Sequence, residues 1–225
     1  MQLSDIDYVL PVDLIAQTPI EPRDSARLLV DQGLSQPLHR HVRDLCSFLK
    51  PNDVLVINHT RVLPARLRAR RSTGGAVEIL LLNQLSNDAV SWEAMIKPGG
   101  KLREGELLSI KQSEMRVEVG ERTIHGDTFV IKLLAPDVLA ELLRVGEVPL
   151  PPYITQTLQD AERYQTVFSH DQRSAAAPTA GLHFTLELLD RVREMGVLIL
   201  EVELVVGLDT FKPISDEDPL EHLIH

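Results

Sequence analysis

The sequence predicts an α/β protein interrupted by an all-β domain, and three observations along its 225 residues support this. Near the start of the chain, a strand-like run, a helical pattern and an apolar run follow one another. The stretch 66–134 then alternates short strand-like runs with turn signals. Helical character returns at Asp137. We therefore expect an α/β domain made of 1–64 and 137–225, with 65–136 as the inserted domain.

The first part of the chain supplies the elements of the α/β domain. Residues 10–24 contain three prolines and predict short turns. Residues 27–30 predict a strand. Apolar residues at the i, i+3, i+4, i+7 spacing then predict an amphipathic helix, and these are Val42, Leu45, Cys46 and Leu49. The continuous apolar run 54–57 is typical of a buried strand.

The middle of the chain predicts a barrel or a sandwich, because its strand-like runs are short and closely spaced. Asp137 is a suitable N-cap for a helix that ends before Gly146. Three prolines within 149–153 then require an extended or turned backbone.

A loop of small residues, 174–185, precedes a helical pattern that stops at Gly196, and 197–206 predicts a further strand. The N-terminus of a helix presents unpaired N–H groups, which suit a phosphate or a carboxylate. An ordinary strand-to-helix turn explains the same pattern, so both interpretations stay open.

Composition favours a folded protein of the cytoplasm. The hydrophobic fraction is 44%, Cys46 is the only cysteine, and no signal segment or membrane-length apolar run is present. The net charge of −10 argues against nucleic-acid binding, yet arginines cluster at positions 61, 66, 68, 70 and 71. On a strand, Arg66, Arg68 and Arg70 share one face, which predicts either a phosphate-binding surface or a solvated face.

Several short motifs, present or missing, restrict which ligands and reactions the sequence favours. Neither a Gly-x-Gly-x-x-Gly turn nor a Gly-Lys-Ser/Thr loop follows a predicted strand, which weakens a dinucleotide or methyltransferase interpretation. The residues 221–225 (Glu-His-Leu-Ile-His) have the spacing of metal ligands, but a structural or phosphate-facing histidine pair fits them better. The residues 58–61 follow the end of a predicted strand, where ligands gather in α/β sheets. The residues 163–166 offer groups that could contact a base, or tie domains together.

Six motifs in order resemble the S-adenosylmethionine:tRNA ribosyltransferase-isomerase family of queuosine biosynthesis. They are Glu21-Pro-Arg-Asp-Ser-Ala-Arg-Leu28, Asn58-His-Thr-Arg-Val62, Glu162-Arg-Tyr-Gln-Thr-Val167, Ala176-Ala-Pro-Thr-Ala-Gly-Leu-His-Phe-Thr185, Val206-Gly-Leu-Asp-Thr-Phe-Lys-Pro213 and Glu221-His-Leu-Ile-His225. The resemblance implies a three-layer α/β domain with an inserted antiparallel β-barrel.

The resemblance also implies a reaction. The family transfers the ribosyl part of S-adenosylmethionine to 7-aminomethyl-7-deazaguanine in a tRNA anticodon, giving epoxyqueuosine. S-adenosylmethionine is then a co-substrate and tRNA the partner. Neither a metal nor a membrane is expected, and we expect a monomer.

Residue roles follow from the resemblance as hypotheses. His183 is the expected catalytic, proton-handling residue. The expected S-adenosylmethionine contacts are Thr179, Ala180, Gly181, Phe184 and Thr185. The expected tRNA and modified-base contacts are Asn58, Thr60, Arg61, Arg66, Arg68, Arg70, Arg163, Tyr164 and Gln165.

The sequence departs from the family pattern at Val205, Asp209, Lys212 and His59, where the family usually has His, Gly, Arg and Asp or Asn. Family chains also continue beyond Glu-His-x-x-His, so we expect a copy that lacks the C-terminal third, with its catalytic competence open. A non-catalytic tRNA-binding remnant is the main alternative, and a methyltransferase a more distant one.

Overall fold

The computed structural model describes residues 2–98, 102–124, 126, 128–151, 153–156, 158, 160–174, 176–205, 218 and 220. Within this part of the chain the strands form a closed barrel and three two-stranded sheets. They are β1 (Arg27–Val30), β2 (Leu38–His41), β3 (Val54–Asn58), β4 (Thr60–Val62), β5 (Arg66–Arg70), β6 (Ala76–Gln84), β7 (Ser91–Lys97), β8 (Leu107–Ile110), β9 (Arg116–Arg122), β10 (Thr128–Leu134), β11 (Asp171–Ser174) and β12 (Leu198–Val202).

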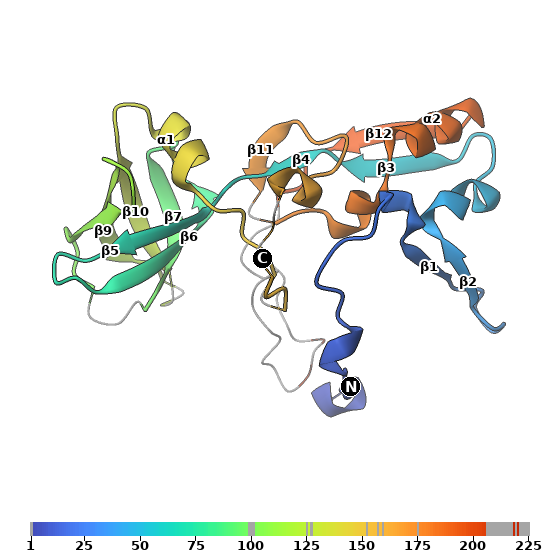
Figure 1. Cartoon of the computed structure of the whole chain (residues 1–225), viewed down its shortest axis with the longest axis horizontal. Helices are drawn as coiled ribbons and strands as arrows, with labels where there is room; N and C mark the ends of the chain where they lie inside the picture. Colours follow the sequence, from blue (N-terminus) through green and yellow to red (C-terminus); the bar gives the residue numbers. More distant parts are fainter. Residues whose placement is uncertain are drawn as a thin grey trace.

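The helices are short. The α-helices are α1 (Val138–Val145) and α2 (Leu186–Glu194). The 3-10 helices are η1 (Leu3–Asp5), η2 (Val12–Leu14), η3 (Arg23–Ser25), η4 (Val42–Phe48), η5 (Ala161–Tyr164) and η6 (Thr179–His183). The barrel lies at one end of the molecule and the β1–β2 hairpin near the other (Figure 1). In the part of the chain that is described, none of these helices has the length and apolar character needed to cross a membrane.

The inserted β-rich segment is a closed barrel, as the resemblance implied. Its strand order is β10-β7-β6-β5-β8-β9, and every neighbouring pair is antiparallel. Alternate residues point inward, so each strand buries one side: in β5, Leu67 and Ala69 are buried while Arg68 and Arg70 are exposed. The predicted arginine stripe therefore lies on the outside of the barrel.

Helix α1 packs against the barrel core and leads back out of it. Its N-cap is Asp137, whose carboxylate accepts a hydrogen bond from the N–H of Ala140, and the helix ends at Gly146, as predicted. Val138 and Leu142 join the barrel core. The barrel thus has a closed hydrophobic interior of its own.

The two connections between the barrel and the rest of the chain run side by side. Arg66 and Glu147 exchange backbone hydrogen bonds of 3.0 and 2.8 Å in an antiparallel bridge. A Cβ atom added to Gly146 would lie 2.0 Å from the carbonyl oxygen of Pro64. This close approach requires glycine at position 146.

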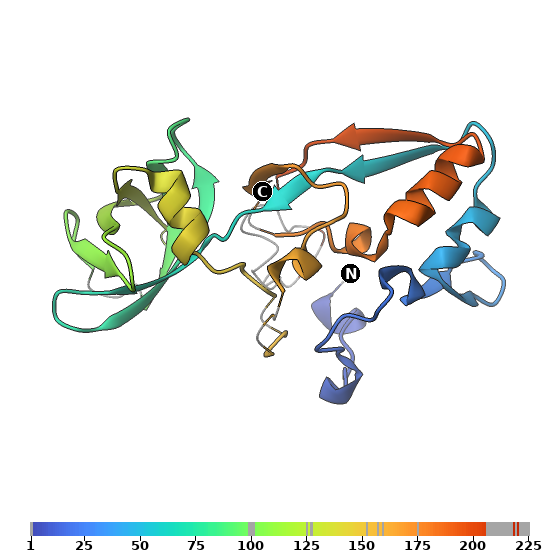
Figure 2. The same ribbon diagram turned by 45° about the horizontal axis from the view of Figure 1, so that its top comes forward.

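Two parallel strand pairs form the remainder of the structure, β3 with β12 and β4 with β11. Helix α2 and η4 cover one face of the β3–β12 pair, where Leu188 and Val192 pack with Leu55 and Ile199. In Figure 2 the helix α2 is seen alongside these strands. Parallel strands and a covering helix agree with an α/β class, while the finer three-layer arrangement stays a prediction.

Two local predictions differ from the structure. The run 54–57 is not buried on both faces: Val54 and Val56 are 51% and 57% exposed, because the described elements cover only one face of β3. The segment after Val42 forms a 3-10 helix and not an α-helix. The predicted helix after Thr185 is confirmed, with the Thr185 hydroxyl accepting from the N–H of Leu188 and Gly196 at φ 81° beyond its end.

Candidate functional site

Two hollows lie on either side of the segment 148–158, which leads from α1 back to the parallel strands. The first, here called the junction cavity, has a volume of 530 Å³ and lies between the barrel and β4. The second, here called the apolar groove, has a volume of 440 Å³ and lies between residues 16–19, η5 and η6. Both volumes suit small-molecule ligands. The two hollows share a wall, which consists of Leu150, Ile154, Gln156 and Leu158.

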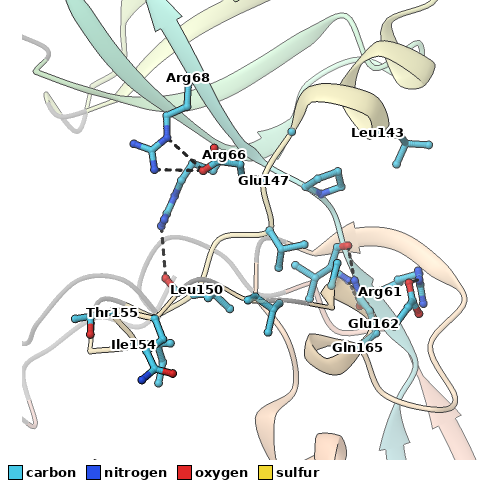
Figure 3. A pocket seen from close by; sticks show the side chains of 17 residues that line it. Arg61, Arg66, Arg68, Leu143, Glu147, Leu150, Ile154, Thr155, Glu162 and Gln165 are labelled. Atoms are coloured by element: carbon cyan, nitrogen blue, oxygen red, sulfur yellow. Dashed lines mark hydrogen bonds and ion pairs between the residues drawn. The ribbon is translucent and has the colours of Figure 1, made fainter. Parts of the chain in front are cut away.

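The junction cavity has a polar lining drawn from several elements. Figure 3 shows two groups of its side chains, Arg66 and Arg68 beside Glu147, and Arg61 beside Glu162 and Gln165. The charged and amide side chains are Arg61, Arg66, Arg68, Glu147, Gln156, Glu162 and Gln165. Arg61 is paired with Glu162 and donates a 3.3 Å hydrogen bond to the hydroxyl of Ser169. This pairing holds the Arg61 guanidinium at the cavity wall.

The arginines of β5 also have carboxylate partners. The guanidinium of Arg68 lies 2.6 Å from a Glu78 carboxylate oxygen and 3.2 Å from one of Glu147. The Nε of Arg66 lies 3.7 Å from Glu78, and one of its amino groups donates to the carbonyl of Leu150 at 3.4 Å. Any phosphate bound here would have to compete with these two carboxylates.

Gln165 joins η5 to β4. It is 5% exposed, its amide oxygen accepts from the N–H of Val62 at 2.9 Å, and its amide nitrogen donates to the Val62 carbonyl at 3.0 Å. Both ends of the amide are therefore engaged by the backbone of one residue. The side chain lines the junction cavity, but its contact with a base stays a prediction.

Asn58 and Thr60 hold the strands rather than line a cavity. The side-chain amide oxygen of Asn58 accepts hydrogen bonds from the N–H and the hydroxyl of Thr60 and from the N–H of Leu204. The Asn58 amide nitrogen donates to the Leu204 carbonyl at 3.0 Å. Of the three residues predicted here, only Arg61 lines either hollow.

The apolar groove gathers several of the other predicted residues. Thr179, His183, Tyr164 and Arg163 line it together with Tyr153 and other largely apolar side chains. Nδ1 of His183 lies 3.3 Å from the carbonyl oxygen of Ala180. Since a carbonyl can only accept, Nδ1 is the donor in this contact, which leaves Nε2 as the ring nitrogen for a substrate contact.

The other residues of the small-residue loop support its shape. Gly181 packs against Thr166 and Phe168, where an added Cβ would lie 3.0 Å from each. Phe184 meets Phe168 edge to face, with ring centroids 6.3 Å apart. Thr185 caps α2 with its own hydroxyl. An S-adenosylmethionine contact by any of these residues stays a prediction.

Tyr164 and Arg163 lie between the groove and the N-terminal segment. Burial raises the pKa of the Tyr164 phenol to about 12. Tyr164 therefore stays protonated at neutral pH, and its phenol oxygen accepts a hydrogen bond from the backbone of Ala177, which opposes this rise in pKa. Arg163 is paired with Glu21 at 2.8 Å and donates to the carbonyl of Ile20 at 2.9 Å.

Arg23 is a structural contributor to both hollows that the sequence analysis did not single out. Its guanidinium donates to the backbone carbonyls of Gln165, Glu162 and Leu182 at 2.7, 2.9 and 3.2 Å. Burial, and then the charge of Arg163, lowers the pKa of Arg23. The only signal in the sequence was its place in the Glu21-Pro-Arg-Asp24 motif, because its partners lie far along the chain.

The positions that depart from the family pattern lie only partly within the described residues. The ring of His59 stacks on that of His170, with centroids 4.2 Å apart, and Nε2 of His170 lies 3.4 Å from Glu201. Val205 is 50% exposed. Asp209, Lys212 and the motifs 206–213 and 221–225 lie outside the described residues. Among the residues that are described, no three His, Cys, Asp or Glu side chains gather at a possible metal site.

A family model and several curated relatives match this chain over nearly all of its length. A protein-family model described as queuosine biosynthesis protein matches residues 3–225. The S-adenosylmethionine:tRNA ribosyltransferase-isomerases of Symbiobacterium thermophilum, Desulforamulus reducens and Dehalococcoides mccartyi (strain CBDB1) are 50%, 45% and 47% identical over 100% of this chain, which spans 66% of their length. The crystal structure of an S-adenosylmethionine tRNA ribosyltransferase from Thermotoga maritima is 32% identical, over 90% of this chain and 58% of that one, with a TM-score of 0.36.

Proposed function

The chain belongs to the queuosine biosynthesis protein family, and from this premise we propose that it transfers the ribosyl part of S-adenosylmethionine to tRNA. The acceptor is the aminomethyl group of 7-aminomethyl-7-deazaguanine in the anticodon. The ribose is rearranged to an epoxycyclopentane, so that the product is epoxyqueuosine, with adenine and methionine released. The protein acts as a monomer in the cytoplasm.

The observation that carries this proposal is the identity of 45–50% with proteins of that name over the full length of this chain. The motifs that led to the same family include residues of both hollows, Arg61 in the junction cavity and His183 in the apolar groove. The proposed chemistry therefore has a place in the part of the fold that is described.

The junction cavity is the proposed site of the tRNA acceptor. Arg61, Arg66 and Arg68 present guanidinium groups there, and such groups bind phosphates in two-pronged geometry. Phosphates would have to displace Glu78 and Glu147 from Arg66 and Arg68. Glu162, in contrast, holds Arg61 at the cavity wall before RNA arrives. Ordered side chains lose less conformational freedom on binding, which favours affinity.

The apolar groove is the proposed site of S-adenosylmethionine. Its mixed lining suits a nucleoside: apolar side chains such as Leu158 and Leu182 face the base, while Thr179 and Asp160 supply polar groups for hydroxyls. Tyr153 and Tyr164 offer aromatic faces, which attract a sulfonium cation. Because Leu150, Ile154, Gln156 and Leu158 line both the groove and the junction cavity, the two substrates would meet across these residues.

His183 is the proposed proton-handling residue. Its Nδ1–H is held by the Ala180 carbonyl, so Nε2 is the atom that accepts a proton from a substrate and later returns it. Tyr164 stays a neutral phenol and can donate a hydrogen bond to a departing base. Arg23 positions both residues indirectly, since it binds the carbonyls of Leu182 and Gln165 that flank them.

The test is turnover by the purified chain with S-adenosylmethionine and a tRNA that carries 7-aminomethyl-7-deazaguanine. We expect adenine and epoxyqueuosine to form in equal amounts, measured by chromatography and by the nucleoside mass after digestion of the tRNA. Binding of tRNA without release of adenine would instead support a non-catalytic tRNA-binding protein. Methyl transfer from labelled S-adenosylmethionine would support a methyltransferase.

The role of His183 has its own matched test. His183→Gln should lower turnover by about 100-fold or more, because general acid–base catalysis contributes on that order. His39→Gln is the control, since His39 lies on the β2 strand outside both hollows. If the His183 variant had the same turnover and the same melting temperature as the unchanged chain, another group would have to move the proton.

A further inference from the structure

A positively charged face continues from the junction cavity along the outside of the barrel. It lies over β5, β6 and β7 and the turn that follows β8. A shallow hollow there is lined by Arg68, Arg70, Lys97, Lys111, Glu78 and Glu147. Arg68 and Glu147 also line the junction cavity, so the two surfaces are continuous.

The strand register brings these side chains together. Arg68 pairs with Glu78 across β5 and β6, and Glu78 pairs with Lys97 across β6 and β7, so the three residues form one row on the outer face. The N–H of Lys111 donates to the carbonyl of Arg68 at 3.1 Å, which places Lys111 on the opposite side of β5. Arg70 follows Arg68 by two residues and points to the same side.

The charges on this face do not cancel. The carboxylates of Glu78 and Glu147 both form ion pairs with Arg68, and Glu78 also lies near Arg66. Among the described residues, Lys97 and Lys111 have no ion pair, and Arg70 makes only a 3.4 Å hydrogen bond to the carbonyl of Gly74. An excess of positive charge on a chain of net charge −10 marks this face as distinct from the rest of the surface.

The chemistry of the face favours a polyanion over a membrane. Lys97, Lys111 and Arg70 are exposed, and the apolar residues that line the hollow are Ala69 and Val77, which belong to the barrel core, and the small Ala76. The hollow therefore offers no large apolar side chain to insert into lipid. Lysine and arginine side chains on a strand surface suit the phosphodiester backbone, which they contact without reading the base sequence. Continuity with the junction cavity indicates the same polyanion at both.

We propose that Arg70, Lys97 and Lys111 form a phosphate-binding face that holds the backbone of the tRNA as it leaves the junction cavity along the barrel. This inference rests on the proposed function, because it takes tRNA as the partner. In this arrangement Glu78 opposes RNA binding, since its carboxylate occupies Arg68 and repels phosphates. The face assigns a role to two lysines that belong to none of the family motifs.

The test is equilibrium binding of the full chain to tRNA over a salt series, with fluorescence anisotropy of labelled tRNA as the readout. For Lys97→Gln with Lys111→Gln, the slope of log K against log salt should fall by between about one and two, because each lost phosphate contact removes about 0.7–0.9. At low salt the affinity should fall about tenfold or more.

The matched control is Lys50→Gln with Lys132→Gln. It removes the same charge from two exposed positions, one in the turn before β3 and one on β10 opposite Ser91. Its slope should equal that of the unchanged chain. A third variant, Glu78→Gln, should bind tRNA more tightly, a gain that misfolding cannot produce.

The outcomes separate this face from the proposed function. Suppose that the unchanged chain binds tRNA and releases adenine, but the lysine variant has the same salt slope as the unchanged chain. The proposal that this face binds phosphates is then wrong, and the proposed function stands. If the slope falls in the lysine variant and not in the control, the face is supported whether or not adenine is released. An equal decrease of the salt slope in the lysine variant and in the control would overturn the proposed face. So would tight binding to anionic phospholipid vesicles, if the lysine variant alone lost this binding while its salt slope for tRNA stayed unchanged.

Discussion

At the scale of single residues, backbone contacts made by a few side chains decide the geometry of the site. Gln165 and Arg23 bind carbonyl groups of distant segments, and Gly146 lets two connections touch. None of the three could be assigned this role from the sequence, since the partners of Gln165 and Arg23 lie more than a hundred residues away. His183 became a candidate through the family resemblance, since its local sequence fits a loop histidine equally well; it lines the apolar groove, and its proton-handling role stays a prediction.

Gly146→Ala should destabilise the protein by about 3 kcal/mol, within the range for forcing an atom into a filled space. The added Cβ would lie 2.0 Å from the Pro64 carbonyl oxygen and 2.7 Å from that of Leu142. Urea unfolding measures the change. Gly75→Ala is the control, because its Cβ would meet only side-chain atoms at 3.7 and 3.8 Å. A Gly146 variant as stable as the control would contradict the close approach.

Gln165→Ala should cost about 1–3 kcal/mol, because the N–H and carbonyl of Val62 would lose their partner inside the protein. Thermal unfolding followed by circular dichroism measures the loss. Gln84→Ala serves for comparison, since Gln84 is exposed at the end of β6. If the two variants unfold alike, water replaces the Gln165 amide and the bond to Val62 contributes little.

At the scale of elements, caps and periodicity predicted α1, α2 and the barrel strands, whose signals are local. The 3-10 form of η4 was missed, because the apolar spacing of Val42, Leu45 and Cys46 suits either helix type over so short a length. The exposed side of β3 was missed for a different reason: an apolar run does not reveal how many layers cover it.

Helix α1 is joined to the barrel by a charged contact that predicts a pH dependence. Hydrogen bonds from Arg144 and then Ser113 lower the pKa of the Glu141 carboxyl from 4.5 to about 2. A lowered pKa in the folded state stabilises the protein above pH 4.5, and this contribution is lost as the pH falls toward 2.

Glu141→Gln should therefore lower the melting temperature at neutral pH and leave it unchanged near pH 2. Differential scanning calorimetry across this range gives the comparison. Glu114→Gln is the control, as it removes an exposed carboxylate next to Ser113. A difference between the Glu141 variant and the unchanged protein that stays constant down to pH 2 would rule out the ionised carboxylate as its cause.

At the scale of the whole molecule, the hydrophobic core is divided. One cluster fills the barrel, a smaller one around Leu188 and Val192 lies under the β3–β12 pair, and a third surrounds Tyr164. Trp92 is the only tryptophan and is 3% exposed within the barrel cluster. Its fluorescence therefore reports on the barrel alone, whereas far-ultraviolet circular dichroism reports on all elements.

Unfolding in urea should show two transitions, with Trp92 fluorescence changing at the higher urea concentration because the barrel has the larger core. Leu188→Ala should shift only the first transition, by about 2–5 kcal/mol. Leu67→Ala, equally buried in the barrel, should shift the fluorescence transition by a similar amount. Coincident fluorescence and circular-dichroism curves in the unchanged protein would mean that the barrel core and the core under the β3–β12 pair unfold as one unit.

The neighbouring connections at Arg66 and Glu147 have one more consequence. Paired strands lie about 5 Å apart, so the point where the chain leaves for the barrel and the point where it returns are almost the same place. The barrel segment could therefore be deleted and the two chain ends joined by a short glycine linker, without stretching the rest of the structure. For the same reason we expect that the barrel of a relative could replace this one through these two joints alone.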